Sequence, residues 1–265
     1  VLIINSQRSG PATGVPTYSG QSDLLFTLNA GHGDFMRFIV APGNANESCY
    51  WAGRLLNLSW KYQTPSILLV DKELSEGTFE FNTKVLDKIK KENPILWNGK
   101  GEYMRYVDSK NGISPMAFPG DKAIVKGTSY EHDQNGISVE DTEAIILMQE
   151  KRIRKFKEME KEIDVAEAIN IYGNKKSKKA IIAWGSTKGV ALEAAEKLGL
   201  KLIQPLILQP FPIKQFKSAI KGVDKLISVE CSALGQMEKL LNCHGIKVDK
   251  SILKYDMRPF TIEEL

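Results

Sequence analysis

QRSGPATGVPT, residues 7–17, separates a short apolar run at residues 1–4 from a helix-like segment that begins after residue 20. Its two glycines and two prolines prevent a helix or a strand from continuing through it. A loop that leaves a strand and enters a helix exposes backbone N–H groups, which favour anions. Arg8 adds a planar set of donors suited to a carboxylate or a phosphate. The stretch therefore predicts an anion-binding loop with one arginine. It also fits a structural turn in which Arg8 only pairs with an acid.

Strand-like and helix-like segments alternate on both sides of this loop. Short apolar runs predict strands at residues 1–5, 38–41 and 66–70, the first and last of buried type. Leucines at helical spacing predict a helix at 21–30, and Asn44 with Glu47 predicts the start of a helix that runs to about residue 62. The alternation indicates a parallel sheet covered on both faces. Ligands of such sheets lie beyond the carboxyl ends of the strands, where we expect the 7–17 loop, the Pro42–Gly43 turn and Asp71.

The second half of the chain repeats this alternation after an irregular region. Residues 74–128 contain turn sequences and few periodic apolar residues, as in a lid or an interface segment. A capping box at Ser138 to Asp141 predicts a long helix that ends near residue 169, followed by a linker at 170–177. Beyond it we expect strands at 180–184, 200–208 and 226–229, and helices at 190–198, 213–220 and 235–243.

Composition excludes several classes of protein. With 42% hydrophobic and 26% charged residues, the 265-residue chain is an ordinary globular sequence with room for two domains. A net charge of +4 does not indicate nucleic-acid binding, because the densest charged run, residues 150–164, mixes both signs. Cys49, Cys231 and Cys243 share no CxxC spacing, so we expect neither a disulfide framework nor an iron–sulfur cluster held by this chain alone. These features indicate a cytoplasmic protein. No apolar run approaches the roughly 20 residues that span a bilayer, and no signal peptide is recognisable.

Other candidate sites carry weaker signals. GSTKG at residues 185–189 is a strand-to-helix turn whose Lys188 suits a phosphate, although a tight turn without a ligand is the favoured explanation. His132 lies between Glu131 and Asp133, whose charges would raise its pKa if they approached the ring. His244, near a helix end, is explained by a favourable contact with the helix dipole. Neither His32 nor His132 has a nucleophilic partner, and no pair of histidines has metal-ligand spacing, so we expect no metal in this chain.

Four stretches in order resemble the α-subunits of 2-oxoacid:ferredoxin oxidoreductases, a thiamine-diphosphate enzyme family. They are the 7–17 loop, then GHGDF at 31–35 with APG at 41–43, then YQTP at 62–65 leading to Asp71, and EHD at 131–133. Late in the chain, Val229-Glu230 with Gly235-Gln236 and the segment 255–260 continue the resemblance, with Met257 where the family pattern has glycine. The resemblance covers most of the chain and is thinnest at 74–128.

This resemblance implies an α/β fold of two parts. Residues 1–137 would be the remainder of a parallel-sheet, pyrimidine-type thiamine-diphosphate-binding domain. Residues 138–177 would form the long helix and linker, and residues 178–265 a smaller open α/β domain like the carboxy-terminal domain of transketolases. Because Val1 is not a methionine and lies inside a strand-like run, we expect the chain to be the back part of a longer protein. The family's threonine-bearing YPITP loop and its aminopyrimidine-activating glutamate would precede Val1.

The resemblance also implies an activity that this chain would not carry alone. The reaction is oxidative decarboxylation of a 2-oxoacid to acyl-coenzyme A, with thiamine diphosphate as cofactor and electrons passing to ferredoxin. A β-subunit would hold the diphosphate with its Mg²⁺ and the iron–sulfur cluster, and this chain would cover the aminopyrimidine end. Arg8 would pair with the substrate carboxylate. The remaining predicted substrate- or cofactor-binding residues are Ser9, Gly10, Thr13, Gly14, Thr17, His132 and Asp133.

Two other functions remain open on the sequence. One is a non-catalytic subunit that binds an anion or a nucleotide and acts as a scaffold. The other is a different thiamine-diphosphate 2-oxoacid dehydrogenase. If the turn at 185–189 binds a ligand, we expect a phosphate of coenzyme A.

Overall fold

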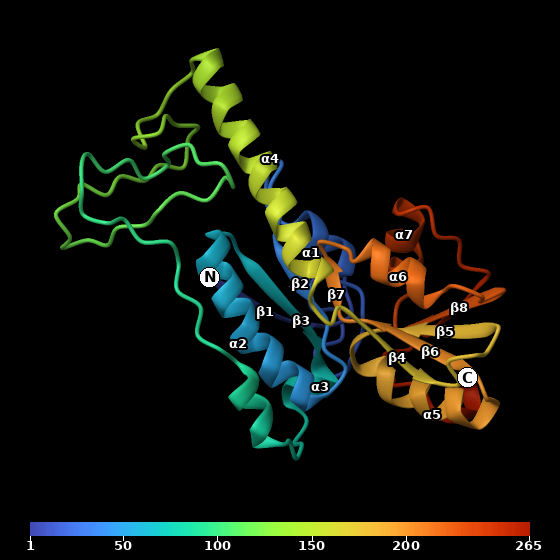
Figure 1. Ribbon diagram of the computed structural model, residues 1–265. Helices are drawn as coiled ribbons and strands as arrows, with labels where there is room; N and C mark the ends of the chain where they lie inside the picture. The colour runs from blue at the N-terminus through green and yellow to red at the C-terminus, as the bar shows by residue number, and fades with distance from the viewer.

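Two sheets, each predominantly parallel, form the frame of the computed structural model, which describes all of residues 1–265 (Figure 1). The first sheet has the strand order β1-β3-β2-β7, with bounds Leu2–Gln7, Ser66–Asp71, Phe38–Val40 and Ile207–Gln209. The second has the order β4-β6-β5-β8-β9, with bounds Ile169–Gly173, Lys201–Pro205, Lys179–Ala183, Lys225–Glu230 and Lys250–Leu253. In each sheet one edge strand, β7 or β4, is antiparallel to its neighbour and all other pairs are parallel. The predicted α/β class with parallel sheets is confirmed.

Alternate side chains of β3 pack into two separate hydrophobic cores, as expected for a strand buried on both faces. Leu68 and Val70 pack with helix α2 (Ala45–Tyr62) and the end of helix α4 (Thr142–Asp164). Ile67 and Leu69 point to the opposite side, into a core shared with the second sheet. Leu24 of the short helix α1 (Leu24–Asn29) belongs to this shared core.

Three further helices cover the second sheet (Figure 1). Helix α5 (Lys188–Leu198) packs its alanines on one face, forming a third core with β5, β6 and β8. Helices α6 (Ile213–Ala219) and α7 (Gln236–Cys243) lie on the opposite face, where Phe216 and Met237 complete the shared core. The two sheets are therefore joined through a common apolar layer.

Residues 72–141, which include the irregular region predicted at 74–128, lie beside α2 and α4 (Figure 1). They contain the short helix α3 (Lys72–Glu76), the 3-10 helix η1 (Thr83–Lys88) and otherwise mostly turns. Two isolated bridges, Leu96 with Met116 and His132 with Ser138, are their strand-like contacts, and the second lies beyond the predicted range of 74–128. Near the chain end, η2 (Gly185–Thr187) precedes α5, and η3 (Ile262–Glu264) follows β9.

Several predicted elements are wrong in detail. The strand at 1–5 is not buried, because β1 is an edge strand and Ile3 and Ile4 are 46% and 60% exposed. Helix α4 is capped by Asp141, whose side chain accepts from Ala144 N at 2.9 Å, and not by Ser138. It also ends at Asp164 instead of near residue 169. The predicted cap at Asn44 is confirmed, since its side chain accepts from Glu47 N at 2.9 Å.

The predicted linker at 170–177 and the single strand at 200–208 are also wrong. Strand β4 occupies residues 169–173 and pairs with β6. The 200–208 run is two strands, because the chain leaves the second sheet after Pro205 and joins the first sheet at Ile207. Strand β9 was not predicted at all. Whether the ranges 1–137, 138–177 and 178–265 act as separate units stays a prediction.

Candidate functional site

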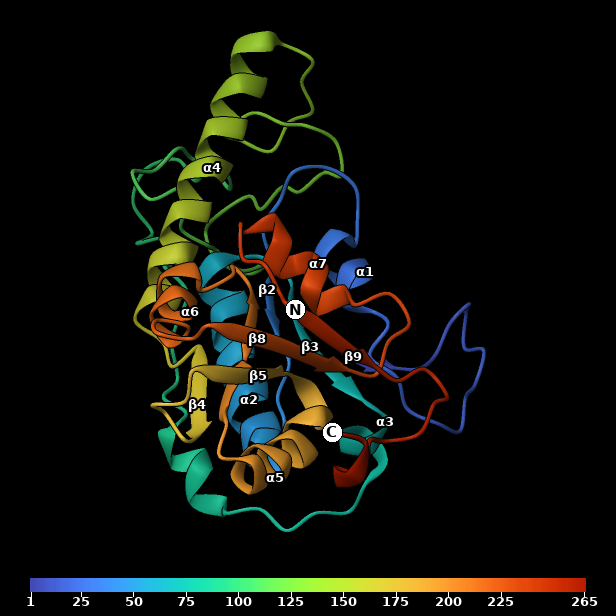
Figure 2. The same ribbon diagram turned by 90° about the vertical axis from the view of Figure 1, so that its right-hand side faces the viewer.

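The loop predicted to bind an anion follows β1 and projects from the molecule (Figure 2). An antiparallel bridge between Ser9 and Val15 closes it, and Gly14 N donates to Pro11 O at 3.1 Å across its tip. Arg8 Nε donates to Pro16 O at 3.0 Å. The loop is thus held at its base by its own backbone, with its tip in solvent.

The tip of this loop presents donors that have no acceptor within the chain. The backbone N–H groups of Gly10, Ala12 and Thr13 make no hydrogen bond, nor do the hydroxyl groups of Thr13 and Thr17. All of these residues are exposed. Ser9 is instead buried at 5% exposure. An exposed row of backbone donors next to an arginine suits an anion that approaches from outside the chain.

Arg8 has a carboxylate partner inside the chain. Its Nη2 forms an ion pair with Glu76 in α3, and its Nη1 donates to Ser6 Oγ at 2.7 Å. The side chain of Glu76 is 49% exposed, that of Arg8 19%. Glu76 also pairs with Lys72 at 2.9 Å, and the pKa of its carboxyl group is lowered, first of all by that hydrogen bond. In the isolated chain, Arg8 is therefore paired with an acid, as in the alternative interpretation of the loop as a structural turn.

Buried polar contacts fix the strand ends behind the loop. Asp71, at the end of β3, caps α3 by accepting from Leu74 N and also accepts from Ser186 N, both at 3.3 Å. Burial raises the pKa of Asp71. Gln21, which is fully buried, donates to Trp184 O at 2.7 Å and accepts from Cys231 N at 2.8 Å. These contacts bring the ends of β3, β5 and β8 together, and Asp71 lies at a strand end as predicted.

The carboxy-terminal segment contacts the same loop. The Arg258 guanidinium lies over the ring of Tyr18, 3.4 Å from its centroid. Met257, which replaces the glycine of the family pattern, has φ +65°, a conformation that favours glycine. Methionine in place of glycine at position 257 therefore keeps the turn but adopts a strained backbone conformation.

The turn at 185–189 does not offer a free phosphate-binding ammonium. Lys188 Nζ lies 2.6 Å from Glu47 Oε1, and both side chains are largely buried. Ser186 N already donates to Asp71. A cavity of about 370 Å³ lies beside this turn, the start of α2 and Cys231, at the ends of β2, β5 and β8. Its charged lining residues are Glu73 and Glu80, which disfavour a phosphate there.

His132 and Asp133 do not join the Arg8 loop. His132 stacks on Tyr106, with ring centroids 3.7 Å apart, in a cavity beside α4 that no residue of the loop lines. The predicted rise of its pKa is wrong: burial lowers the pKa of His132. The Asp133 carboxylate accepts from Asn135 N and Ile137 N within its own turn. His244 also has its pKa lowered by burial, and it stacks on Phe211, which argues against a charged contact with the helix dipole.

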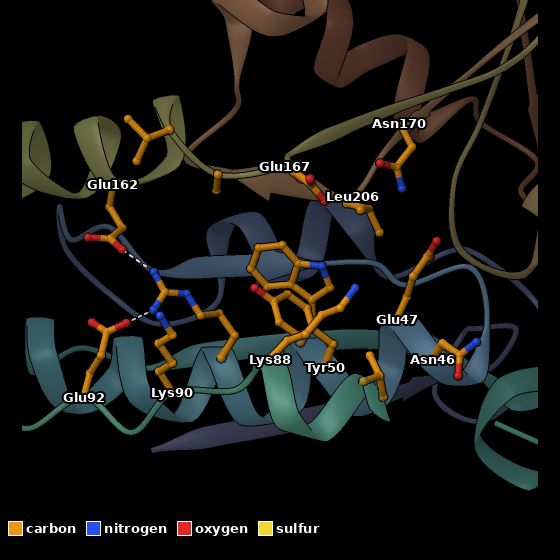
Figure 3. Close-up of a pocket in the computed structure, with 15 residues that line it drawn as sticks. Asn46, Glu47, Tyr50, Lys88, Lys90, Glu92, Glu162, Glu167, Asn170 and Leu206 are labelled. Carbon is orange, nitrogen blue, oxygen red and sulfur yellow. Dashed lines mark hydrogen bonds and ion pairs between the residues drawn. The ribbon is translucent and has the colours of Figure 1, made fainter. Parts of the chain in front are cut away.

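Another cavity, of about 560 Å³, lies between α2, η1 and β4 (Figure 3). Acidic and basic side chains face each other across it. Arg54 forms ion pairs with Glu92 and Glu162, and Lys61 pairs with Glu162 at 2.7 Å. Neither sign of charge dominates, because the lining contains three bases and four acids: Arg54, Lys88, Lys90, Glu47, Glu92, Glu162 and Glu167.

Sequence reasoning missed the residues that support the loop. Glu76 is 68 positions from Arg8, and no local pattern marks it as the partner. Gln21 and Glu230 are buried polar residues next to the strand ends, and their local sequence indicates only that they lie near predicted turns. The three cysteines are free thiols, and burial raises the pKa of Cys231 to about 12.

Comparison with known proteins gives the class to which this fold and loop belong. Residues 1–151 match the family described as pyruvate flavodoxin/ferredoxin oxidoreductase, thiamine-diphosphate-binding, and the chain belongs to that family. Within it, the chain is 39% identical to the 2-oxoacid:ferredoxin oxidoreductase subunit alpha of Saccharolobus solfataricus. It is 40% identical to the 2-oxoacid:ferredoxin oxidoreductase 1 subunit alpha of Sulfurisphaera tokodaii. Both alignments cover 100% of this chain and 43% of the relative.

A solved structure gives the same assignment. The chain matches a 2-oxoglutarate:ferredoxin oxidoreductase from Magnetococcus marinus, determined with 2-oxoglutarate, coenzyme A and succinyl-coenzyme A bound. The TM-score is 0.88 and the identity 31%, over 99% of this chain and 46% of that chain. The chain thus spans less than half the length of the proteins it matches. None of its helices has both the length and the apolar character that a membrane-spanning helix needs.

Proposed function

We propose that this chain is the substrate-positioning part of a 2-oxoacid:ferredoxin oxidoreductase α-subunit. In this proposal Arg8 binds the carboxylate of the 2-oxoacid, and Ser9, Gly10, Thr13, Gly14 and Thr17 shape the surrounding loop. The reaction is oxidative decarboxylation to acyl-coenzyme A and CO₂ with reduction of ferredoxin. The observation that supports it best is the exposed loop tip, whose backbone and hydroxyl donors have no acceptor in the chain.

Before Arg8 can bind a substrate carboxylate, its ion pair with Glu76 has to break. A 2-oxoacid carboxylate has the same chemistry as the Glu76 carboxylate, so it competes for the same guanidinium donors. Because Glu76 is half exposed and also held by Lys72, it keeps one cationic partner after Arg8 changes to the substrate. A surface ion pair of this kind contributes little to stability, so its exchange for the substrate is a small barrier to binding.

The residues of the loop fit a thiamine diphosphate shared with a second polypeptide. The donors at the tip of the loop are exposed and have no acceptor in the chain, and Arg8 lines none of the cavities described above, so we infer that this chain alone offers one wall of a site. When bound, the cofactor supplies the nucleophilic carbon that decarboxylation of a 2-oxoacid requires. Arg8 orients the acid against it, and a charge-assisted contact of this type is worth about 1.5–3 kcal/mol.

The remaining components belong to partner chains in this proposal. A β-subunit holds Mg²⁺ with the diphosphate and carries the iron–sulfur cluster, and ferredoxin accepts the electrons. Coenzyme A is the acyl acceptor, for which the ligands of the Magnetococcus marinus enzyme are the support. His132 and Asp133 lie beside α4 and not at the loop, so this proposal assigns them no contact with the substrate.

The test is 2-oxoacid-dependent dye reduction by the assembled complex. Arg8→Ala should raise KM about 10- to 100-fold, the equivalent of the contact energy above. Glu76→Gln is the matched control: it breaks the same ion pair but keeps the guanidinium, so KM should stay within about 3-fold of the wild-type value or fall.

Two results would contradict the proposal. If Arg8→Ala and Glu76→Gln lower the free energy of unfolding equally and leave KM unchanged, Arg8 only stabilises the loop and does not bind the substrate. If the complex with bound thiamine diphosphate reduces no dye with any 2-oxoacid, the chain is a scaffold or belongs to a different dehydrogenase.

A further inference from the structure

A cavity beside α4 gathers positive charge without a matching acid. It has a volume of about 240 Å³ and is lined by Arg105, Lys151, Arg152 and Lys155, with no aspartate or glutamate in the lining. We call it the basic cavity. The cavity in Figure 3 differs, because its lining contains four glutamates, two of which form ion pairs with Arg54.

Three of the four bases lack a carboxylate partner. Arg152 pairs with Glu131, to which its Nη1 donates at 3.0 Å. Arg105 donates to the amide oxygen of Gln63 at 2.7 Å and forms no ion pair. Lys151, only 8% exposed, and Lys155 form neither a hydrogen bond nor an ion pair through their ammonium groups.

Their arrangement is unfavourable without a ligand. Lys151 and Lys155 are one helical turn apart, a spacing at which like charges repel. An unpaired ammonium removed from water is also costly. Burial in the first place, and then neighbouring positive charges that include Arg105, lower the pKa of each lysine to about 8. At pH 7 such groups are still about nine-tenths protonated.

The walls of the cavity are built to hold this arrangement. Gly112, with φ +73°, lies so close to α4 that an added Cβ would be 2.3 Å from Lys151 O. Tyr106 is stacked on His132 and faces Arg105, whose guanidinium lies 5.0 Å from the ring centroid. The irregular region is therefore packed against the lysines instead of leaving them in solvent.

We propose that the basic cavity binds a small phosphate-type oxyanion through Arg105, Lys151 and Lys155. The volume is below the 300–1,000 Å³ typical of sites for larger ligands, so a phosphate or a small phosphomonoester fits the space better than a nucleotide. Three donors of the same sign converging on one small space match a dianion. The site is separate from the Arg8 loop, and its existence does not depend on the proposed function.

The other charged groups around the cavity do not neutralise the lysines. Glu131 is held by Arg152, and Asp108 is held by Arg154. His132 has its pKa lowered by burial, and burial raises the pKa of Tyr62 above its usual range, so both are uncharged at pH 7. Binding of sulfate, whose charge is constant above neutral pH, should therefore weaken from pH 7 to pH 9 as the lysines lose their protons.

Calorimetric titration of the assembled protein with inorganic phosphate at pH 7 tests the proposal. The double variant Lys151→Met, Lys155→Met should lose at least 10-fold in affinity for this site. Lys157→Met, an exposed lysine on the same helix, is the control for net charge and should bind as the wild type does. Because the double variant lacks the two unpaired ammonium groups, its melting temperature without phosphate should be higher than that of the wild type. The same measurement shows that the double variant folds.

The location and source of the anion are tested in parallel. Crystals soaked in selenate should give an anomalous peak within about 4 Å of the two lysine Nζ atoms, an ion-pair distance. Tighter binding of glycerol 3-phosphate than of inorganic phosphate assigns the site to a phosphorylated metabolite, and the reverse order to free phosphate. Equal phosphate affinity of wild type and double variant, or selenate bound only elsewhere, overturns the proposal.

Discussion

Glu230 is a carboxyl group that folding removes completely from water. Its oxygens accept from Met237 N at 3.2 Å, at the start of α7, and from Trp184 Nε1 at 3.4 Å. These donors favour the ionised form, but burial outweighs them and raises the pKa of Glu230 to about 7. Because the unfolded chain ionises near pH 4.5, the native state holds this proton more tightly between those values.

Replacing Glu230 should therefore change how stability depends on pH. The wild type has the full contribution of the neutral carboxyl below about pH 4.5 and loses it as the pH rises through about 7. Glu230→Gln lacks this loss, so at pH 8 it should be about 1–3 kcal/mol more stable than the wild type, with little difference at pH 5. Urea unfolding at both pH values measures this. Glu193→Gln, an exposed glutamate on α5, is the control, and an identical pH dependence in all three proteins would contradict the assignment.

At the scale of elements, the contact between the irregular region and α4 depends on Gly112. Its φ of +73° already disfavours a side chain, and a Cβ there would meet backbone atoms of Lys151 and Lys155 at 2.3 and 2.6 Å. Backbone atoms of a helix cannot move aside as the end of a flexible side chain can. A side chain at this position must separate the loop from the helix.

Gly112→Ala should lower the free energy of unfolding by about 2–4 kcal/mol, through strain and lost packing together. Gly99 is the matched control, because its φ is +76° but an added Cβ would meet nothing within 4 Å. Gly99→Ala should cost only the backbone strain, about 1–2 kcal/mol. Denaturant unfolding of both variants gives the difference, and equal losses would mean that the loop does not pack against α4 in solution.

Local chemistry determined which elements and site residues were predictable. Strand β3 was recognisable because its apolar run is buried on both faces, whereas β4 and β9 are edge strands with polar residues such as Asn170 and Ser251. The start of α4 was misplaced because Ser138 and Asp141 both have capping chemistry, and only Asp141 uses it. The Arg8 loop was readable from its glycines and prolines. Its partner Glu76, and the gathering of Arg105 with Lys151, depend on tertiary contacts that no local pattern contains.

For the whole molecule, one carboxylate connects the two sheets. Glu47 lies at the start of α2, next to the first sheet, and accepts from Gly43 N at 2.6 Å. It also accepts from Lys188 of α5 at 2.6 Å and from Gln204 of β6 at 2.8 Å, both in the second sheet's half. These contacts are partly buried and Lys188 is 7% exposed, so loss of the carboxylate leaves a largely buried ammonium unpaired.

Glu47→Gln should therefore lower the free energy of unfolding by about 3–5 kcal/mol. Adding Lys188→Met to this variant removes the unpaired ammonium, so the double variant should be less destabilised than the sum of the two single variants by at least about 1 kcal/mol. A double-mutant cycle in urea measures this coupling. Strictly additive losses would mean that the ion pair is not formed in solution.

The passage from β6 to β7 limits how this subunit can move. One residue, Leu206, separates a strand of the second sheet from a strand of the first, and its N–H donates to Ala168 O while its carbonyl accepts from Ala41 N. A hinge motion between the two sheets would have to break these backbone hydrogen bonds and separate the apolar layer that both sheets share. We therefore expect any opening and closing around a ligand to occur in the loops at the strand ends, above all at residues 8–18, and not between the two sheets.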